Sequence, residues 1–544
     1  MKRILACSIV LAMLLSLCAC GDGDNTVTTT TENGETTTTV DSVVSDDEGE
    51  TTTAAGGSTT TMTLPIRVTA AKTTASSNRS GTTTVTQKTT TTTTVATEAP
   101  EKVETSGGFT FTVTNGTATI IESESISGGV LNIPATLNGY TVVGIDNRAF
   151  AKHTEITEVI IPDSVTLIGT SAFNGCSKLA SVTMGKGVQK INNKAFTDCK
   201  QLKSVYVTDL AAWCSVDFGS EANPLFHGGT LYVNKAPLSG DVTVPNGATR
   251  VGGYAFYGCA DITSITLPNS VKEIGPNAFV GCAGLSSIAF GNGVTDIGLK
   301  AFNGCAKLKM LVLPNSLVNI GAEAFSGCSV LESVDFPNKV EEVGAGAFQG
   351  CGKLKRVNIT DLAAWCRVNF RIDSLKTANP TYYSKARLYL NGTEVEGDIV
   401  VPKETGVVGE GVFYGYRYIT SVVFEEGITK LGGYIFPSCT GLQSVIIPNT
   451  VTSIGSCTFY DCDLLSEITI PNSVKEIGWS TFYLCDGLQT VNLGSGIKEI
   501  GGDAFKSCPI LKTVNYAGSK AMREKISIGK NNEALTGATW NYAS

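Results

Sequence analysis

The chain has 544 residues, a formal net charge of −8, charged side chains at 17% of positions and only two histidines. A single compact core rarely grows to this length, so we expect several domains or a repeat array. Phosphate backbones would repel a mildly acidic chain that has no run of Lys or Arg, so the composition argues against nucleic-acid binding.

The start of the chain has the pattern of a secretory signal peptide. A positive pair, Lys2-Arg3, precedes the apolar stretch Ile4–Leu17, which is shorter than the roughly 20 residues that span a bilayer comfortably. Positions 17–21, Leu-Cys-Ala-Cys-Gly, resemble the lipobox of bacterial lipoproteins. This resemblance implies that the segment 1–20 is a signal peptide with its lipobox and that Cys20 is the lipidated residue. The alternative is an ordinary cleaved signal peptide with incidental cysteines, and in both cases the protein leaves the cytoplasm.

The segment 21–105 is rich in threonine. Threonine occupies 31 of the 81 positions from Asn25 to Thr105, and aromatic residues are absent. Such a segment buries too little apolar surface to offset the conformational entropy lost on folding. We therefore predict a disordered tether that lifts the body of the protein off the membrane. O-linked glycosylation of the tether and an unmodified linker both fit its composition.

Phenylalanines recur at one fixed step through the rest of the chain, in three blocks. They stand at positions 150, 173 and 196, then at 256, 279, 302, 325 and 348, then at 413, 436, 459, 482 and 505. Cysteine follows three residues later in eleven of the thirteen repeats, and Leu or Ile follows six residues later in every one. A fixed period in this range is typical of a solenoid, in which stacked repeats share one core.

The repeat read from Ile262 to Cys282 shows how one coil is expected to fold. Ile265-Thr266-Leu267 alternates apolar and polar residues, which predicts a short strand with two side chains inward and one outward. Pro268 ends this strand because it has no N–H for a ladder hydrogen bond. Gly275 is expected to permit a turn, and Ala-Phe-x-x-Cys is short enough for one turn of α- or 3₁₀-helix.

This motif, Leu-x-x-Ile-x-Leu-Pro-x-x-Val-x-x-Ile-Gly-x-x-Ala-Phe-x-x-Cys, resembles the BspA-type leucine-rich repeat of bacterial surface proteins. The resemblance covers roughly residues 107–544. It implies a leucine-rich-repeat solenoid with parallel β-strands and short helical or 3₁₀ turns. It also implies an adhesin-like role, because members of this family are known or suspected to bind host matrix proteins, other cells or surface glycans.

The three blocks of repeats are separated by two inserted modules. Asp209 and Asp361 each begin the sequence Asp-Leu-Ala-Ala-Trp-Cys, which an Asn-Pro pair and a Leu-Tyr pair follow. Each module is either a projecting lobe with a recognition site or a spacer that closes one block and starts the next. A hairpin signal, Asn115-Gly116 between alternating segments, predicts an N-terminal cap. The expected organisation is a cap with block 1 (106–208), a module (209–245), block 2 (246–360), a module (361–402), block 3 (403–516) and a C-terminal cap that echoes the modules (517–544).

The cysteines three residues after each Phe, which we call the cysteine column, could in principle be a metal, disulfide or catalytic site. Zinc needs ligands that converge on a point, and a linear ladder of cysteines does not supply them. Neighbouring coils lie within disulfide range, but His153 and Tyr416 replace cysteine in two repeats, so the position does not demand a thiol. We therefore interpret the column as small buried hydrophobic residues. The sequence shows no nucleophile–base pattern and no phosphate loop, so we expect no catalytic residue, no metal site and no cofactor.

The outward strand position, ten residues after each Phe, is the expected binding face. It is small, polar and nearly uncharged, which suits an extracellular protein or polysaccharide partner better than a small molecule. The best contact candidates are Tyr206, Asp335, Asn358 and Asn492. The expected function is non-catalytic binding at the extracellular face of the bacterial membrane, to which the N-terminal lipid would anchor the chain. The alternatives are a merely solvated face on a structural envelope or spacer component and, less favoured, a glycan-acting enzyme.

Overall fold

The computed structural model describes residues 26–32, 35–41, 102–123, 126, 128–373 and 376–543. The chain divides into two compact units, Met1–Glu98 and Ala99–Ser544. In the first unit, β1 (Thr26–Glu32) and β2 (Glu35–Asp41) pair as an antiparallel hairpin, where the tether was expected to have no secondary structure. The signal peptide, Cys20 and most of the predicted tether lie outside the described residues.

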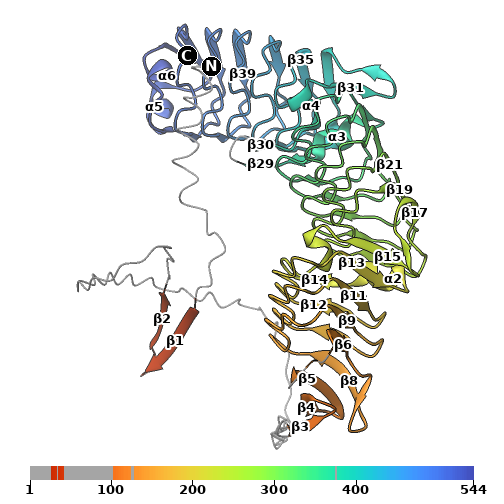
Figure 1. Ribbon diagram of the computed structural model, residues 1–544. Helices are drawn as coiled ribbons and strands as arrows, with labels where there is room; N and C mark the ends of the chain where they lie inside the picture. Colours follow the sequence, from red (N-terminus) through yellow and green to blue (C-terminus); the bar gives the residue numbers. More distant parts are fainter. Residues whose placement is uncertain are drawn as a thin grey trace, which may run out of the picture. The chain divides into compact units, whose positions relative to one another are not determined.

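The second unit is the predicted solenoid, and its regular coils contain two short strands instead of one (Figure 1). In one coil, β19 (Ile262–Thr266) is followed by β20 (Glu273–Ile274), and the next coil begins with β21 (Ser287–Ala289). Strands equivalent to β19 pair in parallel with one another, and strands equivalent to β20 do the same. We call the first set the front strands and the second set the back strands.

The front strands carry the outward position that was identified in the sequence. They are β6 (Val130–Asn132), β9 (Glu158–Ile160), β11 (Ser181–Met184), β13 (Ser204–Val207), β15 (Thr230–Val233), β17 (Gly240–Thr243), β19, β21, β23 (Met310–Val312), β25 (Ser333–Asp335), β27 (Arg356–Ile359), β31 (Arg387–Leu390), β33 (Gly397–Val401), β35 (Ile419–Phe424), β37 (Ser444–Ile446), β39 (Glu467–Ile470), β41 (Thr490–Leu493), β43 (Thr513–Tyr516) and β45 (Thr539–Tyr542).

The back strands, mostly two residues long, form three sheets, and the sheets end at the modules. They are β8 (Tyr140–Ile145), β10 (Leu167–Ile168), β12 (Lys190–Ile191) and β14 (Asp217–Phe218); β18 (Arg250–Val251), β20, β22 (Asp296–Ile297), β24 (Asn319–Ile320), β26 (Glu342–Val343) and β28 (Asn369–Phe370); and β34 (Val407–Val408), β36 (Lys430–Leu431), β38 (Ser453–Ile454), β40 (Glu476–Ile477), β42 (Glu499–Ile500) and β44 (Ser527–Ile528).

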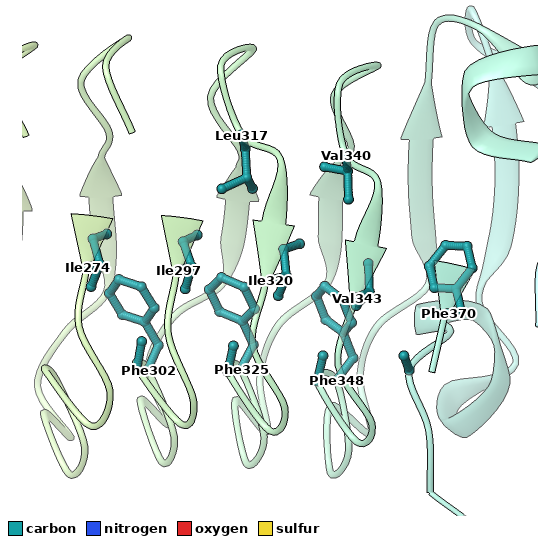
Figure 2. Close-up of a cluster of buried hydrophobic side chains, with 14 of the residues drawn as sticks. Ile274, Ile297, Phe302, Leu317, Ile320, Phe325, Val340, Val343, Phe348 and Phe370 are labelled. Carbon is teal, nitrogen blue, oxygen red and sulfur yellow. The ribbon is translucent and has the colours of Figure 1, made fainter. Parts of the chain in front are cut away.

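The periodic phenylalanines stack on one another inside the solenoid. Within each block, neighbouring rings lie nearly parallel, with centroids 5.0 Å apart for Phe256 and Phe279 and 5.3 Å apart for Phe302 and Phe325. Figure 2 shows three of these rings in a row beside the inward side chains of the back strands. Offset stacking adds about 0.5–1.5 kcal/mol per pair to the burial of each ring. One contiguous apolar core extends from Phe111 to Leu535 and crosses both modules.

The segment around each phenylalanine forms consecutive turns, and the predicted helical turn is wrong here. The φ angle is positive at Asn277 (58°) and Gly281 (74°), on both sides of Phe279. Left-handed residues at this spacing interrupt a right-handed helix. The N–H of Phe279 instead donates to the carbonyl of Ala301 in the next coil at 2.7 Å. Gly275 has a different role from the one expected, because a Cβ there would lie 2.5 Å from the backbone nitrogen of Gly253.

The N-terminal cap contains the predicted hairpin and one further strand. β4 (Phe109–Thr114) and β5 (Thr117–Ser123) pair around Asn115-Gly116, where φ is 50° and 77°, as a type I′ turn requires. The further strand, β3 (Lys102–Ser106), pairs with β4, so the cap starts before the expected boundary at position 106. β5 also pairs in parallel with β8, and β7 (Thr136–Leu137) pairs antiparallel with β8.

Each inserted module is itself a coil of the solenoid, which agrees with a spacer better than with a projecting lobe. In the first module, α2 (Leu210–Ser215), β14, the 3₁₀-helix η1 (Pro224–His227) and β15 make one coil, and β16 (Ala236–Pro237) folds back on β15. The second contains the equivalent α3 (Leu362–Arg367), β28, α4 (Pro380–Ser384), β31 and β32 (Thr393–Glu394), with an added hairpin of β29 (Ile372–Asp373) and β30 (Lys376–Thr377).

The C-terminal cap has the same order of elements as the modules. α5 (Lys520–Arg523) precedes β44, and α6 (Glu533–Thr536) precedes β45. A further 3₁₀-helix, η2 (Lys403–Thr405), opens block 3. In the part of the chain that the structure describes, no helix is long and apolar enough to cross a membrane.

A buried asparagine replaces the phenylalanine in each inserted module. Asn223 and Asn379 stand where the repeats place Phe, and each donates from Nδ2 to a backbone carbonyl of the following coil. In the C-terminal cap, Asn532 lies one position earlier; its Oδ1 accepts from the Phe505 N–H and its Nδ2 donates to the carbonyl of Gly501. Asn379 Nδ2 donates to the carbonyls of Gly411 (2.9 Å) and Val412 (2.7 Å), which links the module to block 3. Directed hydrogen bonds therefore take over where the ring stack is interrupted.

We predict that Asn379→Ala lowers the free energy of unfolding by about 2–4 kcal/mol, because the buried carbonyl of Val412 loses its donor and that of Gly411 keeps only the Tyr414 N–H. Denaturation in guanidinium chloride measures this loss. The control is Asn541→Ala at the exposed end of the last front strand, which should change stability by less than about 0.5 kcal/mol. Equal stability of the two variants would contradict the role assigned to Asn379.

Candidate binding face

The four predicted contact residues all lie on the outward side of the front strands. Tyr206 is on β13, Asp335 on β25, Asn358 on β27 and Asn492 on β41, and all four are half-buried. Their neighbours along each strand point into the core, as the two-residue period of a strand requires. The structure therefore places the candidates on one face of the solenoid, at different positions along it.

Only two of the candidates are in contact with each other. Asn358 Nδ2 donates to Asp335 Oδ1 at 2.6 Å. Tyr206 and Asn492 lie on other front sheets, in block 1 and block 3. The binding face thus offers three separate places, and two of them are hollows beside a module.

The first hollow lies over the end of block 1 and the first module. Tyr206 stacks on Tyr232 of β15, with ring centroids 4.8 Å apart and an interplanar angle of 29°. The hairpin turn between β15 and β16 forms one rim, with Asn234 and Lys235. The hollow has a volume of about 730 Å³ and is also lined by Glu158, Ser181, Thr183 and Thr208.

The second hollow lies over the end of block 2 and the second module. Arg356 Nε donates to Asn358 Oδ1 at 2.6 Å, and the Arg356 guanidinium carbon lies 3.7 Å from the ring centroid of Tyr389. Asp335 completes this network through its bond to Asn358. The hairpin turn at Asn391-Gly392 again forms a rim, and the volume is about 580 Å³. This lining combines the charged, hydrogen-bonded network with apolar residues such as Val312 and Leu313, whereas the first lining contains the tyrosine pair.

Asn492 belongs to a ladder of side-chain amides. Asn541 Nδ2 donates to Asn515 Oδ1 at 2.9 Å, and Asn515 Nδ2 donates to Asn492 Oδ1 at 2.8 Å. Asn492 Nδ2 in turn donates to Glu467 Oε1 at 2.6 Å. Because these amides bond mainly to one another, the ladder resembles a self-contained surface feature more than a ligand site.

Sequence reasoning missed Tyr232, which lines the first hollow, and Arg356, which lines the second. It also missed Tyr389, whose ring lies against the Arg356 guanidinium. Strand pairing places Tyr232 beside Tyr206 and Tyr389 beside Asn358, in the outward column. The fixed step of the repeats does not reach these tyrosines, because the coils that contain the modules are longer. The shared Leu-Tyr pairs of the modules were the available signal, and aligning them with the front strands would have located both tyrosines.

The cysteine column is buried, and the described residues of the column form no disulfide. Cys282 Sγ donates to the carbonyl of Phe256 in the preceding coil at 3.1 Å, and other members of the column make the same contact. Burial raises the pKa of Cys305 and of Cys351 to about 12. A neutral thiol is a poor nucleophile and a poor metal ligand, so the column serves packing.

Other ionisable groups show no convergence on a reactive centre within the described ranges. The His153 ring lies 2.8 Å from Glu155 Oε1 on the surface, and this pairing lowers the pKa of Glu155. The described residues contain no group of three or more His, Cys, Asp or Glu side chains that could hold a metal ion.

Solved structures of several leucine-rich repeat proteins are similar to this chain. Solved structures similar to this chain include a leucine-rich repeat protein from Bacteroides ovatus, which is 25% identical with a TM-score of 0.44 and covers 81% of this chain and 100% of its own. A leucine-rich cell surface protein from Faecalibacterium prausnitzii is 23% identical with a TM-score of 0.37 and covers 79% and 99%. The pneumococcal vaccine antigen PcpA is 17% identical with a TM-score of 0.30 and covers 81% and 99%. No curated protein matches the chain.

These structural scores lie below 0.5, so the family assignment depends on the match to a family model. The model of the BspA-type leucine-rich repeat region matches in 6 copies, over residues 131–212, 248–367 and 398–526. These ranges include more than half of the chain and all three blocks of repeats. The chain therefore belongs to the BspA-type leucine-rich repeat family.

Proposed function

We propose that this chain is an adhesin-like surface protein that binds an extracellular protein or polysaccharide through the front face of its solenoid. The observation that carries the proposal is the pair of hollows at equivalent places beside the two modules. A repeat protein presents a broad outward surface on a rigid core, and here that surface is hollowed twice by the same element, the module hairpin.

The membership of the family supports a role as a repeat-based binding or surface protein. The N-terminal pattern adds a location: we propose export, lipidation at Cys20 and display on the extracellular face of the membrane. The burial and raised pKa values of the column thiols support a non-catalytic role, because cysteine is the most abundant nucleophilic side chain along the core.

A structural role at the cell envelope is the second candidate. The amide ladder from Asn492 to Asn541 favours it, because this part of the front face satisfies its own hydrogen bonds. A face of this kind needs no soluble ligand to be stable in water.

Purified full-length protein should bind saturably to at least one of three classes of ligand: matrix proteins, mucins or polysaccharides. A double variant, Tyr206→Ala with Arg356→Ala, alters both hollows and should bind about tenfold more weakly or worse, as expected for the loss of central interface contacts. Circular dichroism checks that this variant is folded. If the unaltered protein binds none of the three classes, the binding role is contradicted and the structural role is favoured.

Radiolabelled palmitate fed to expressing cells should enter the protein and should be absent from a Cys20→Ala variant. Cys18→Ala is the matched control and should keep the label, because Leu17 beside Cys18 fits the lipobox pattern poorly. Label that persists in Cys20→Ala would refute the anchoring proposal.

A further inference from the structure

We propose that the first hollow is a carbohydrate-binding site that takes an uncharged sugar chain. This inference deepens the proposed function and rests on it, because it names the ligand class for one place on the front face. The hollow combines a stacked tyrosine pair with a lining of hydroxyl and amide groups.

The tyrosine pair supplies an apolar surface for the C–H groups of a sugar ring. Tyr232 covers one face of the Tyr206 ring, at a centroid distance of 4.8 Å. The strand order β11–β13–β15 places Thr183 on the other side of Tyr206. Because threonine is small, the second face of the Tyr206 ring has no aromatic neighbour on the adjacent described strand, and a flat apolar ligand face can pack there.

The remaining lining suits the hydroxyl groups of a sugar. Ser181, Thr183 and Thr208 contribute hydroxyls, which both donate and accept hydrogen bonds, and Asn234 contributes an amide. The two charged residues of the lining, Glu158 and Lys235, have opposite signs. The hollow therefore has no net charge that would select an anionic or a cationic ligand.

The size of the hollow also favours a few sugar units over a protein surface. Its volume of about 730 Å³ lies within the range of small-ligand sites, roughly 300–1,000 Å³. A stable protein interface needs about 800 Å² on each partner, which a single hollow of this size does not offer. A chain of sugars can fill the hollow and continue along the outward column.

The second hollow provides an internal comparison. Tyr389 holds the position equivalent to Tyr232, but the Arg356 guanidinium lies over its ring at 3.7 Å. Its neighbour Asn358 is bonded to Asp335 and to Arg356. The Tyr389 ring and the polar groups of Arg356 and Asn358 therefore already contact one another. For this reason we assign the uncharged sugar to the first hollow only.

The test is affinity electrophoresis of the full-length protein in gels that contain dextran, laminarin, mannan or galactomannan, with heparin and hyaluronan as charged counterparts. At least one neutral polysaccharide should retard the protein. Tyr206→Ala should weaken this binding about tenfold or more, whereas Tyr206→Phe, which keeps the ring, should stay within about threefold. Tyr389→Ala is the matched control and should bind as the unaltered protein does.

Two results would overturn the inference. If no neutral polysaccharide retards the protein, or if only the charged ones do, the site does not bind uncharged sugars. Binding to a matrix protein in the earlier screen would then still support the proposed function. Retardation that Tyr206→Ala leaves unchanged removes the site. If the protein binds none of these polysaccharides, matrix proteins or mucins, the proposed function fails as well.

Discussion

The stacking of one phenylalanine per coil is the interaction on which the rest of the structure depends. Ring centroids repeat at 4.9 to 5.7 Å within the blocks, close to the spacing of about 4.8 Å between paired strands. Rings and strands can therefore advance together only if every coil has the same length. This match explains why the step between phenylalanines stays constant within each block, and it fixes the outward column on the front face.

The places where this regular step changes are also the places where the front face becomes hollow. Strand pairing joins Val182 to Val205 across a regular coil, but it joins Val205 to Leu231 and Val357 to Leu388 across the longer coils of the modules. These longer coils replace the ring with Asn223 or Asn379, and they use the extra residues for a helix and a hairpin. The hairpins form the rims of the two hollows beside the outward column of the front strands. The hollows therefore arise where the regular repeat is interrupted.

The features that repeat, or that carry a strong turn signal, could be predicted from the sequence, whereas very short strands and positions that depend on the lengths of the modules were missed. The Phe, Leu and Cys columns point inward and the hairpin at Asn115-Gly116 is present, because repeated patterns and turn residues carry strong local signals. The back strands were missed because two residues such as Glu273–Ile274 are too short to show an alternation. Tyr232 and Tyr389 were missed because their place in the outward column depends on the lengths of the modules. The adhesin-like role and the lipid anchor remain proposals.

Thiol reactivity measures the central claim most directly, because cysteine accompanies the phenylalanine in most coils. The fourteen cysteines of the described residues are buried and carry thiols, with no disulfide among them. The account predicts that a thiol reagent such as iodoacetamide, followed by mass spectrometry, leaves these fourteen unlabelled in the native protein and labels all of them after unfolding in guanidinium chloride. Rapid labelling of column cysteines from several coils in the native protein would contradict a single buried core shared by all three blocks.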